Sequence, residues 1–398
     1  MLLWSGEFVS AIGGGLSSFG LSVYMFQQTG SAASTALVTL LAFLPALVLG
    51  VPAGVLADRF DRRTLMMLGD GCSALGLIYI LICMMNGKAA LWQICLGVTV
   101  SSVFSSLLEP AYKATVTDLL TKEEYTKASG LMGLAGSARY LVSPVLAGAL
   151  LAVSDIRLLL VIDIATFVLT VTVTGIVKKG LQTKKSTETH SFVVDIKDGW
   201  NVVTKNKGVL TLIIMTSVMT FSMGAIQILS EPMILSFANS STLGIAETVC
   251  ASGMLVSSLI LGIRGMKKNY VKLLCLSLFA AGICMMLFGW KDSITIIFIF
   301  GFLFFAMLPF ANGALDYLIR TNIPEELQGR VWGLIGLLTQ IGYVAAYGIS
   351  GLIADGIAKA MQISVVRGSG LVITAFGILL MSVTVGLYFM KSVRELEA

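Results

Sequence analysis

Twelve apolar segments account for most of this chain, and each is long enough to cross a lipid bilayer as a helix. A span requires about 20 apolar residues, whose backbone groups hydrogen-bond within the segment because hydrocarbon offers them no partner. Only 12% of the 398 residues are charged, whereas soluble proteins carry about 25%. The sequence therefore predicts an all-α membrane protein with twelve transmembrane helices. The predicted spans are 3–26, 32–56, 64–86, 89–112, 128–152, 156–177, 208–230, 243–264, 270–289, 293–317, 330–354 and 368–390.

Lysine and arginine residues are concentrated in alternate loops. Most of the 27 basic residues fall on one side of the membrane if the first span begins in the cytoplasm. Cytoplasmic loops are enriched in these two residue types, so we expect both termini in the cytoplasm. The net charge of +5 follows from this asymmetry and does not indicate a nucleic-acid partner. The basic residues expected on the opposite side are Lys88, Arg157, Lys291, Lys359 and Arg367.

The two halves of the sequence resemble each other. A shift of 203 positions aligns glycines, leucines and a tyrosine of the fifth span with those of the eleventh. Two parallel six-helix repeats around a central site are a known plan for a secondary transporter. We therefore predict an N-terminal six-helix bundle over 1–177 and a C-terminal six-helix bundle over 208–398. The aligned pairs include Gly130 with Gly333, Gly133 with Gly336, Tyr140 with Tyr343 and Gly148 with Gly351.

The predicted linker between the bundles, 178–207, is the one long polar stretch of the chain. Its first part is rich in threonine, lysine and serine, whereas 191–205 has apolar residues at helical spacing. An amphipathic helix with lysines and a tryptophan is typical of a membrane surface. We predict such a helix on the inner surface, and a soluble linker helix is the alternative. The apolar residues are Phe192, Ile196, Trp200 and Val203.

A short, strongly charged turn separates the second span from the third. It reads Gly54-Val55-Leu56-Ala57-Asp58-Arg59-Phe60-Asp61-Arg62-Arg63, and so dense a charge cluster must lie outside the hydrocarbon. The turn resembles the loop signature of the major facilitator superfamily, Gly-x-x-x-Asp-Arg/Lys-x-Gly-Arg/Lys-Arg/Lys. Asp61 stands where that family usually has glycine. The matching residues are Gly54, Asp58, Arg59, Arg62 and Arg63.

The resemblance implies that this turn is part of a cytoplasmic gate. Asp58 and Arg62 would bond the inner ends of helices when the transporter faces outward. Asp61 would stiffen this latch by pairing with one of the neighbouring arginines. Asp70 and Asp118, near cytoplasmic helix ends, are expected to form salt bridges with the same turn.

The fifth span carries a remnant of the proline-glycine motif of superfamily antiporters, from Ser143 and Pro144 to Gly148. Further segments resemble a bacterial branch of macrolide-efflux and siderophore-export permeases. This resemblance implies a monomeric secondary transporter of the bacterial cytoplasmic membrane that exports small molecules by alternating access. It further implies protons as the coupling ion. The segments are Leu3-Trp4-Ser5-Gly6, Gln28-Thr29-Gly30-Ser31-Ala32, Pro110-Ala111, Leu119-Leu120 and Gly136-Ser137-Ala138-Arg139.

Arg139 is the clearest charge inside a predicted span. An ionised side chain at the centre of a membrane helix costs about 2.5–3.5 kcal/mol, so a carboxylate is expected nearby. Glu109 is the first candidate, and Glu7 and Asp163 are the others. Our hypothesis is that Glu109 alternates between pairing with Arg139 and carrying a proton. The alternative is a fixed ion pair that holds the N-terminal bundle together.

Two further groups of residues are candidates for the C-terminal half. Glu231 precedes Pro232, which breaks a helix and frees carbonyl groups, as expected where a helix lines a cavity. Glu231 attracts cationic substrates in this hypothesis, and a solvated residue at the mouth is the alternative. Asp316 and Arg320, one turn apart, are predicted to form a surface pair.

The sequence favours transport over catalysis. It has one histidine, His190, six cysteines without metal-ligand spacing, and no nucleotide-binding loop of the Gly-x-x-x-x-Gly-Lys-Ser/Thr type. No arrangement of nucleophiles and bases meets the needs of an enzyme, and no cofactor or metal is expected. Export of a drug-like amphipathic molecule is the main hypothesis. The rivals are export of a self-made siderophore or peptide, and a lipid flippase or scramblase.

Overall fold

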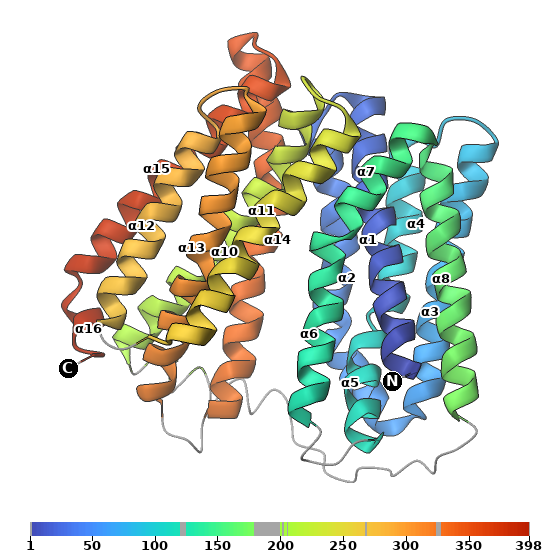
Figure 1. Cartoon of the computed structure of the whole chain (residues 1–398), viewed down its shortest axis with the longest axis horizontal. Helices are drawn as coiled ribbons and strands as arrows, with labels where there is room; N and C mark the ends of the chain where they lie inside the picture. Colours follow the sequence, from blue (N-terminus) through green and yellow to red (C-terminus); the bar gives the residue numbers. More distant parts are fainter. Residues whose placement is uncertain are drawn as a thin grey trace. The chain divides into compact units, whose positions relative to one another are not determined.

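The computed structural model describes residues 2–119, 125–178, 200, 203–204, 206–266, 269–323 and 328–397. Within these residues the regular elements are helices, and twelve segments are long and apolar enough to cross a membrane (Figure 1). The predicted fold class is therefore confirmed. Of the predicted amphipathic helix over 191–205, the description covers Trp200, Val203 and Thr204, which are helical. Val203 is buried and Trp200 exposed.

The first half of the chain forms eight helices in the described residues. They are α1 (Leu2–Thr29), α2 (Ala32–Arg59), α3 (Arg62–Met85), α4 (Leu91–Ser105), α5 (Leu108–Leu119), α6 (Tyr125–Leu141), α7 (Ser143–Val153) and α8 (Ile156–Lys178). The second half continues with α10 (Lys207–Leu235), α11 (Ser240–Arg264), α12 (Tyr270–Phe288), α13 (Ile294–Thr321), α14 (Gln328–Met361), α15 (Val365–Phe389) and α16 (Lys391–Arg394).

The chain divides into two compact units, and each unit includes a short segment from the other half of the sequence. Unit 1 comprises Met1–Gly30, Ser34–Thr187 and Ala238–Thr248. Unit 2 comprises Ser31–Ala33, Glu188–Phe237 and Val249–Ala398. The start of α11 thus belongs to unit 1, and the start of α2 belongs to unit 2.

Both units have the same internal packing. In unit 1, α1 packs on α6, α7 and α8, while α3 packs on α4, α5 and α8 (Figure 1). In unit 2, α10 packs on α14 and α15, while α12 packs on α13 and α15. The neighbours of α1 and α3 in one unit therefore correspond to those of α10 and α12 in the other. This is the pseudo-repeat that the shift of 203 positions predicts.

Two predicted spans of unit 1 are each built from two helices. The predicted helix 89–112 is interrupted between α4 and α5, and 128–152 is interrupted at Val142 between α6 and α7. Pro110 and Pro144 lie in the first turn of the helix that follows each break. Proline lacks an N–H group and clashes with the carbonyl four residues before it, which weakens the preceding helix at both breaks. Proline alone does not end a helix in this protein, because α2, α10 and α13 continue through internal prolines. In the second half α14 runs unbroken, and Tyr347 stands where the repeat has Pro144.

Candidate functional site

Three charged side chains are buried among the residues that the structure describes, and all three belong to unit 1. They are Arg63 (7% exposed), Asp70 (1%) and Asp163 (2%). A buried charge that lacks a close partner is strongly destabilising, because its lost hydration is not replaced. These residues therefore mark the part of the protein where a functional role for charge is best supported.

Asp70 lies on α3 and forms no hydrogen bond through either carboxyl oxygen within the described residues. It is within electrostatic range of Glu7 on α1 and of Asp163 on α8. The predicted salt bridge between Asp70 and the charged turn is therefore wrong. Asp70 follows Arg63 by seven residues, so both point to the same interior face of α3. Two helical turns separate them along the helix axis.

Asp163 lies on α8, where it is packed against α1. A Cβ atom added to Gly13 of α1 would lie 2.8 Å from Asp163 Oδ1, so only glycine fits there. Thr166 Oγ1 donates to Asp163 Oδ1 at 3.4 Å. Arg139 of α6 is also within electrostatic range of Asp163. The sequence named both Asp163 and Arg139 as site candidates, and the structure brings them into one region of unit 1.

Glu109 does not pair with Arg139, contrary to our first expectation. Its Oε1 atom lies 2.5 Å from Nζ of Lys113, one turn along α5, and both side chains are largely exposed. The new helix that starts at Leu108 sets this orientation, and a carboxylate in a first helical turn is also favoured by the helix dipole. Glu7 is half-buried and lies within electrostatic range of both Glu109 and Arg139.

The charged turn is held by side-chain contacts with backbone groups. Arg62 donates to the carbonyl oxygens of Ala57 (3.2 Å) and Ala114 (3.0 Å), which joins the end of α2 to α5. Asp61 Oδ1 accepts from the N–H groups of Arg63 and Thr64 at 3.0 Å, which caps α3. Asp61 thus has a capping role that the sequence interpretation missed.

Other residues of the predicted gate are less informative. Gly54 lies within α2 with open space where a side chain would project, and Arg59 is the exposed last residue of that helix. The side chains of Asp58 and Asp118 lie outside the described part of the chain. The expected Asp58–Arg62 latch therefore stays a prediction.

The helix 5 motif lies at the junction of α6 and α7. Ser143 Oγ donates to the Ile12 carbonyl oxygen of α1 at 3.1 Å, and Pro144 is buried beside it. Within unit 1, a Cβ atom added to Gly148 would lie 2.6 Å from the Ser240 carbonyl oxygen. Thr248 Oγ1 donates to the Leu141 carbonyl oxygen at 2.8 Å. The motif therefore lets backbones approach closely on two sides of α7.

Unit 2 mirrors this close approach. A Cβ atom added to Gly351 would lie 2.6 Å from the carbonyl oxygen of Ala32, and Gly351 is the repeat partner of Gly148. Asp355, one turn further along α14, accepts from Ser31 Oγ (2.6 Å) and from the N–H groups of Ala32 (3.1 Å) and Ala33 (3.0 Å). Asp355 therefore caps the N-terminus of α2.

The remaining candidates of the second half lie in unit 2. Glu231 is half-buried on α10 beside the buried Pro232. The predicted helix break at Pro232 is wrong, because α10 continues through this proline to Leu235. One turn before Glu231, Gln227 accepts from the Tyr347 hydroxyl of α14 at 2.8 Å. The predicted surface pair is confirmed, because Arg320 Nε lies 3.0 Å from Asp316 Oδ2 with both side chains about half exposed.

Sequence reasoning missed Glu247 as well as the burial of Asp70. Glu247 is half-buried on α11, in the segment that belongs to unit 1. The sequence contains the signal that would identify Glu247, namely a charged residue inside a predicted span. The same signal identifies Arg139. No group of three or more histidine, cysteine or acidic residues suited to a metal ion occurs in the described residues.

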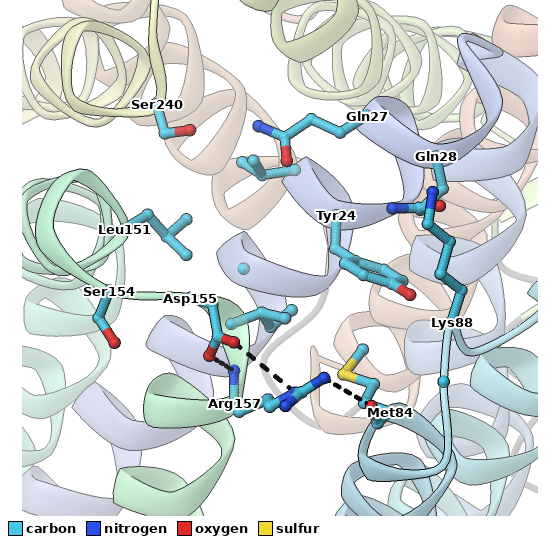
Figure 2. Close-up of a pocket in the computed structure, with 14 residues that line it drawn as sticks. Tyr24, Gln27, Gln28, Met84, Lys88, Leu151, Ser154, Asp155, Arg157 and Ser240 are labelled. Atoms are coloured by element: carbon cyan, nitrogen blue, oxygen red, sulfur yellow. Dashed lines mark hydrogen bonds and ion pairs between the residues drawn. The ribbon is translucent and has the colours of Figure 1, made fainter.

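Unit 1 also contains a polar cavity of about 300 Å³, shown in Figure 2. Tyr24, Gln27 and Gln28 of α1 line it together with Lys88 and Arg157. Arg157 Nη2 donates to the Met84 carbonyl oxygen at 2.7 Å, and its Nε lies 3.6 Å from Asp155 Oδ2. Arg157 thus joins the end of α3 to the start of α8, and Lys88 is the other basic residue that lines this cavity.

Comparison with known proteins agrees with this architecture. A family model described as Major Facilitator Superfamily matches residues 3–347. The chain is 27% identical over 366 residues to Macrolide efflux protein A of Streptococcus pyogenes, covering 89% of this chain and 88% of that protein. It is 27% identical over 310 residues to Macrolide efflux protein A of Enterococcus faecalis, covering 76% of this chain and 95% of that protein.

Solved structures of transporters have the same fold. A bacterial homologue of the iron transporter ferroportin in an inward-facing state aligns with a TM-score of 0.75, 15% identity and 98% coverage of each chain. The nucleoside transporter NupG aligns with a TM-score of 0.74, 13% identity, and coverage of 98% of this chain and 99% of that one. At these identities the likeness concerns the fold alone.

Proposed function

Because the chain belongs to the Major Facilitator Superfamily, we propose that it exports macrolide-like, amphipathic small molecules by proton-coupled alternating access. It is a transporter and not an enzyme. The named macrolide-efflux relatives support the direction and the substrate class. We further propose that it acts in the bacterial cytoplasmic membrane with both termini in the cytoplasm, as the distribution of lysine and arginine predicts.

The observation that carries the coupling proposal is the burial of Asp70 and Asp163 in unit 1. An ionised group inside a membrane helix costs about 2.5–3.5 kcal/mol, so a carboxylate without a close partner is stable there chiefly as the neutral acid. Arg139 lies within electrostatic range of Asp163 and favours the ionised form. Burial favours the neutral acid and a nearby arginine favours the carboxylate. A carboxyl group exposed to both effects is suited to binding and releasing a proton as its surroundings change.

We therefore propose the coupling role for Asp163 and Asp70 rather than for Glu109. Glu109 is largely exposed and forms an ion pair with Lys113, so it is a solvated surface residue and not a buried carboxyl group. In the proposed cycle, a proton on Asp163 weakens its attraction to Arg139. Loss of the proton restores that attraction and favours the other state of the transporter.

One proton per substrate supplies enough free energy for useful export. A driving force of 100–200 mV gives roughly 2.3–4.6 kcal/mol for each proton. That free energy supports a concentration ratio of about 50 to 2000 across the membrane. A single coupling carboxyl group therefore suffices.

The proposal is tested with inside-out membrane vesicles that receive an imposed proton gradient and radiolabelled erythromycin. We expect wild-type vesicles to accumulate the macrolide, and Asp163→Asn and Asp70→Asn to lose most of this accumulation. Both variants should still exchange internal for external macrolide, because exchange needs no net proton movement. Glu109→Gln is the matched control and should accumulate macrolide as the wild type does.

The same vesicles distinguish the rival functions. Proton-driven accumulation of a siderophore or a peptide, without movement of the macrolide, would show that the proposed substrate class is wrong. The proposed proton-coupled mechanism would still hold. Redistribution of a fluorescent phospholipid between leaflets, without accumulation of either solute, would favour a lipid flippase. Full accumulation by both asparagine variants would overturn the coupling role of Asp70 and Asp163.

A further inference from the structure

A stripe of buried polar side chains follows one face of α8. Its members are three or four residues apart, so they lie above one another on the same side of the helix. The opposite side carries Thr172, which is exposed. Threonine is common where membrane helices pack together, but a buried aspartate in line with three threonines concentrates polar groups on one face of α8. The stripe consists of Asp163 (2% exposed), Thr166 (8%), Thr170 (2%) and Thr174 (0%).

The hydroxyl groups of this stripe retain hydrogen-bonding capacity. Thr166 donates to the Asp163 carbonyl oxygen and Thr170 to the Thr166 carbonyl oxygen, both at 2.7 Å. Each hydroxyl oxygen can still accept two hydrogen bonds. Thr174 Oγ1 has no hydrogen-bond partner among the described residues, although it is fully buried. Buried polar atoms of this kind are usually satisfied by internal water.

Helices α1 and α3 complete the surroundings of the stripe. The Ser17 hydroxyl of α1 lies close to Asp163 without a hydrogen bond of good geometry. Asp70 of α3 contributes two further buried oxygens that lack partners. Gly6 and Gly13 of α1 face the stripe without side chains of their own. Polar atoms from three helices therefore surround one narrow region of unit 1.

The stripe extends from the interior of unit 1 towards the helix end at Lys178. With a rise of 1.5 Å per residue, Asp163 lies about 22 Å from that end and Thr174 about 6 Å. Glu7 is about 7 Å from the start of α1 by the same rule. The polar groups thus span roughly 16 Å along α8 and approach the surface at the end where the chain begins.

The ionisable groups around the stripe come from four helices. Asp163 lies within electrostatic range of Arg139 of α6 and Asp70 of α3. Asp70 is also within electrostatic range of Glu7 of α1, and Glu7 is within range of Glu109 and Tyr112 of α5. Helix α7, which also packs on α8, has no ionisable residue.

We propose that internal water joins these groups into a proton-conducting column between Asp163 and the helix end at Lys178. Its use in transport rests on the proposed proton coupling, whereas its existence does not. Asp163 breaks its O–H bond and passes the proton to the nearest water. Each water and hydroxyl oxygen then accepts one proton and releases another, so that one proton reaches bulk water. The carboxylate that remains is stabilised by Arg139.

With the N-terminus in the cytoplasm, the column opens to the cytoplasm. A proton that reaches Asp163 from outside would then be released inside, which is the direction that antiport of an exported substrate requires. The column therefore serves as the proton exit of the proposed cycle.

The column is tested by time-resolved infrared spectroscopy of the purified full chain in lipid nanodiscs after a jump from low to high pH. The signal is the C=O stretch of protonated carboxyl groups, assigned with Asp163→Asn and Asp70→Asn. We expect Thr170→Val and Thr174→Val, which keep the side-chain shape and remove the hydroxyl, to slow the decay about tenfold or more. Thr172→Val, on the exposed face of the same helix, is the matched control and should decay at the wild-type rate.

A packing effect is separated from a relay effect by Thr174→Ser. Serine keeps the hydroxyl and loses the methyl group, so it should restore the fast decay if the hydroxyl conducts. A slow Thr174→Ser variant, or wild-type rates in both valine variants, would overturn the proposal. So would a carboxyl band that neither asparagine variant reduces. The infrared experiment contains no transported substrate. Its result is therefore independent of whether the vesicles accumulate macrolide.

Discussion

Gly13 of α1 has no room for a side chain. A Cβ atom at this position would lie 2.5 Å from Thr166 Oγ1 and 2.8 Å from Asp163 Oδ1, so these side chains or α8 itself would have to move. The next residue, Gly14, has no atom within 4 Å of the same position. Gly13 and Gly14 therefore have different structural roles, although they are adjacent in the same helix. Gly13 holds the buried carboxyl group and its hydroxyl neighbour in place, and Gly14 faces open space.

We expect Gly13→Ala to lower the free energy of unfolding by about 1–3 kcal/mol, as overpacking of a tight interface does. It should also reduce proton-driven export, because Asp163 is displaced. Gly14→Ala should change stability by at most about 1 kcal/mol, in the stabilising direction, because alanine favours the helix. Chemical denaturation of the detergent-solubilised protein measures both variants. Equal losses at the two positions would contradict the close packing of Gly13.

At the scale of single residues, the sequence identifies which charged residues lie inside a span. It does not show whether their side chains point into the bundle or away from it. Arg139, Glu7 and Asp163 were found because any charge inside a span requires an explanation. Asp70 was assigned to the charged turn because it is near a helix end, and only the packing of α3 shows that it points inward. Glu109 is the first candidate partner of Arg139 in the sequence, but the structure pairs it with Lys113. Which face of a helix a residue occupies depends on where that helix starts.

At the scale of elements, apolar length predicts the spans and proline modifies them. The twelve predicted spans correspond to the twelve found in the described residues, with ends that differ by up to seven residues. The breaks before α5 and α7 lie next to Pro110 and Pro144, and the sequence analysis did not predict them. Proline is not a sufficient signal, because α10 continues through Pro232. The N-terminus of α2 depends instead on a contact distant in sequence, because Asp355 of α14 caps it. No local pattern predicts such a cap.

Removal of this cap should loosen the first turn of α2. Asp355→Ala deletes three hydrogen bonds, so we expect a loss of about 1–2 kcal/mol and faster amide hydrogen exchange at residues 32–36. Asp355→Asn keeps one acceptor oxygen and should give an intermediate rate. Asp292→Ala, at an exposed position, is the control. Unchanged exchange in Asp355→Ala would show that the cap contributes little.

At the scale of the whole molecule, the two units share their packing but differ in charge. The repeat partner of Arg139 is Gly342, which packs closely on Ser217 and Thr220 of α10. No acidic residue described in unit 2 is buried as Asp70 and Asp163 are. The sequence predicted the repeat from ordered glycines. It did not predict this division of roles, because a shift alignment compares residue types and not their burial.

The orientation of the molecule in the membrane is a separate prediction. We expect Lys88→Cys, in a variant without the six native cysteines, to react with a membrane-impermeant maleimide in intact cells. Phe60→Cys, at the exposed charged turn, should react only after the cells are permeabilised. The asymmetry of lysine and arginine is the reason. The reverse labelling pattern would mean that both termini lie outside the cytoplasm.

The exchange of short segments between the units has a consequence for biosynthesis. Unit 1 includes Ala238–Thr248, so it is not complete when the ribosome finishes the first half of the chain. At 5–20 residues per second, the stretch from 188 to 248 takes roughly 3–12 s to emerge. During that time the backbone surfaces at Pro144 and Gly148 lack the contacts that α11 later provides. A nascent chain that stalls in this interval would expose them to the insertion machinery and to membrane proteases.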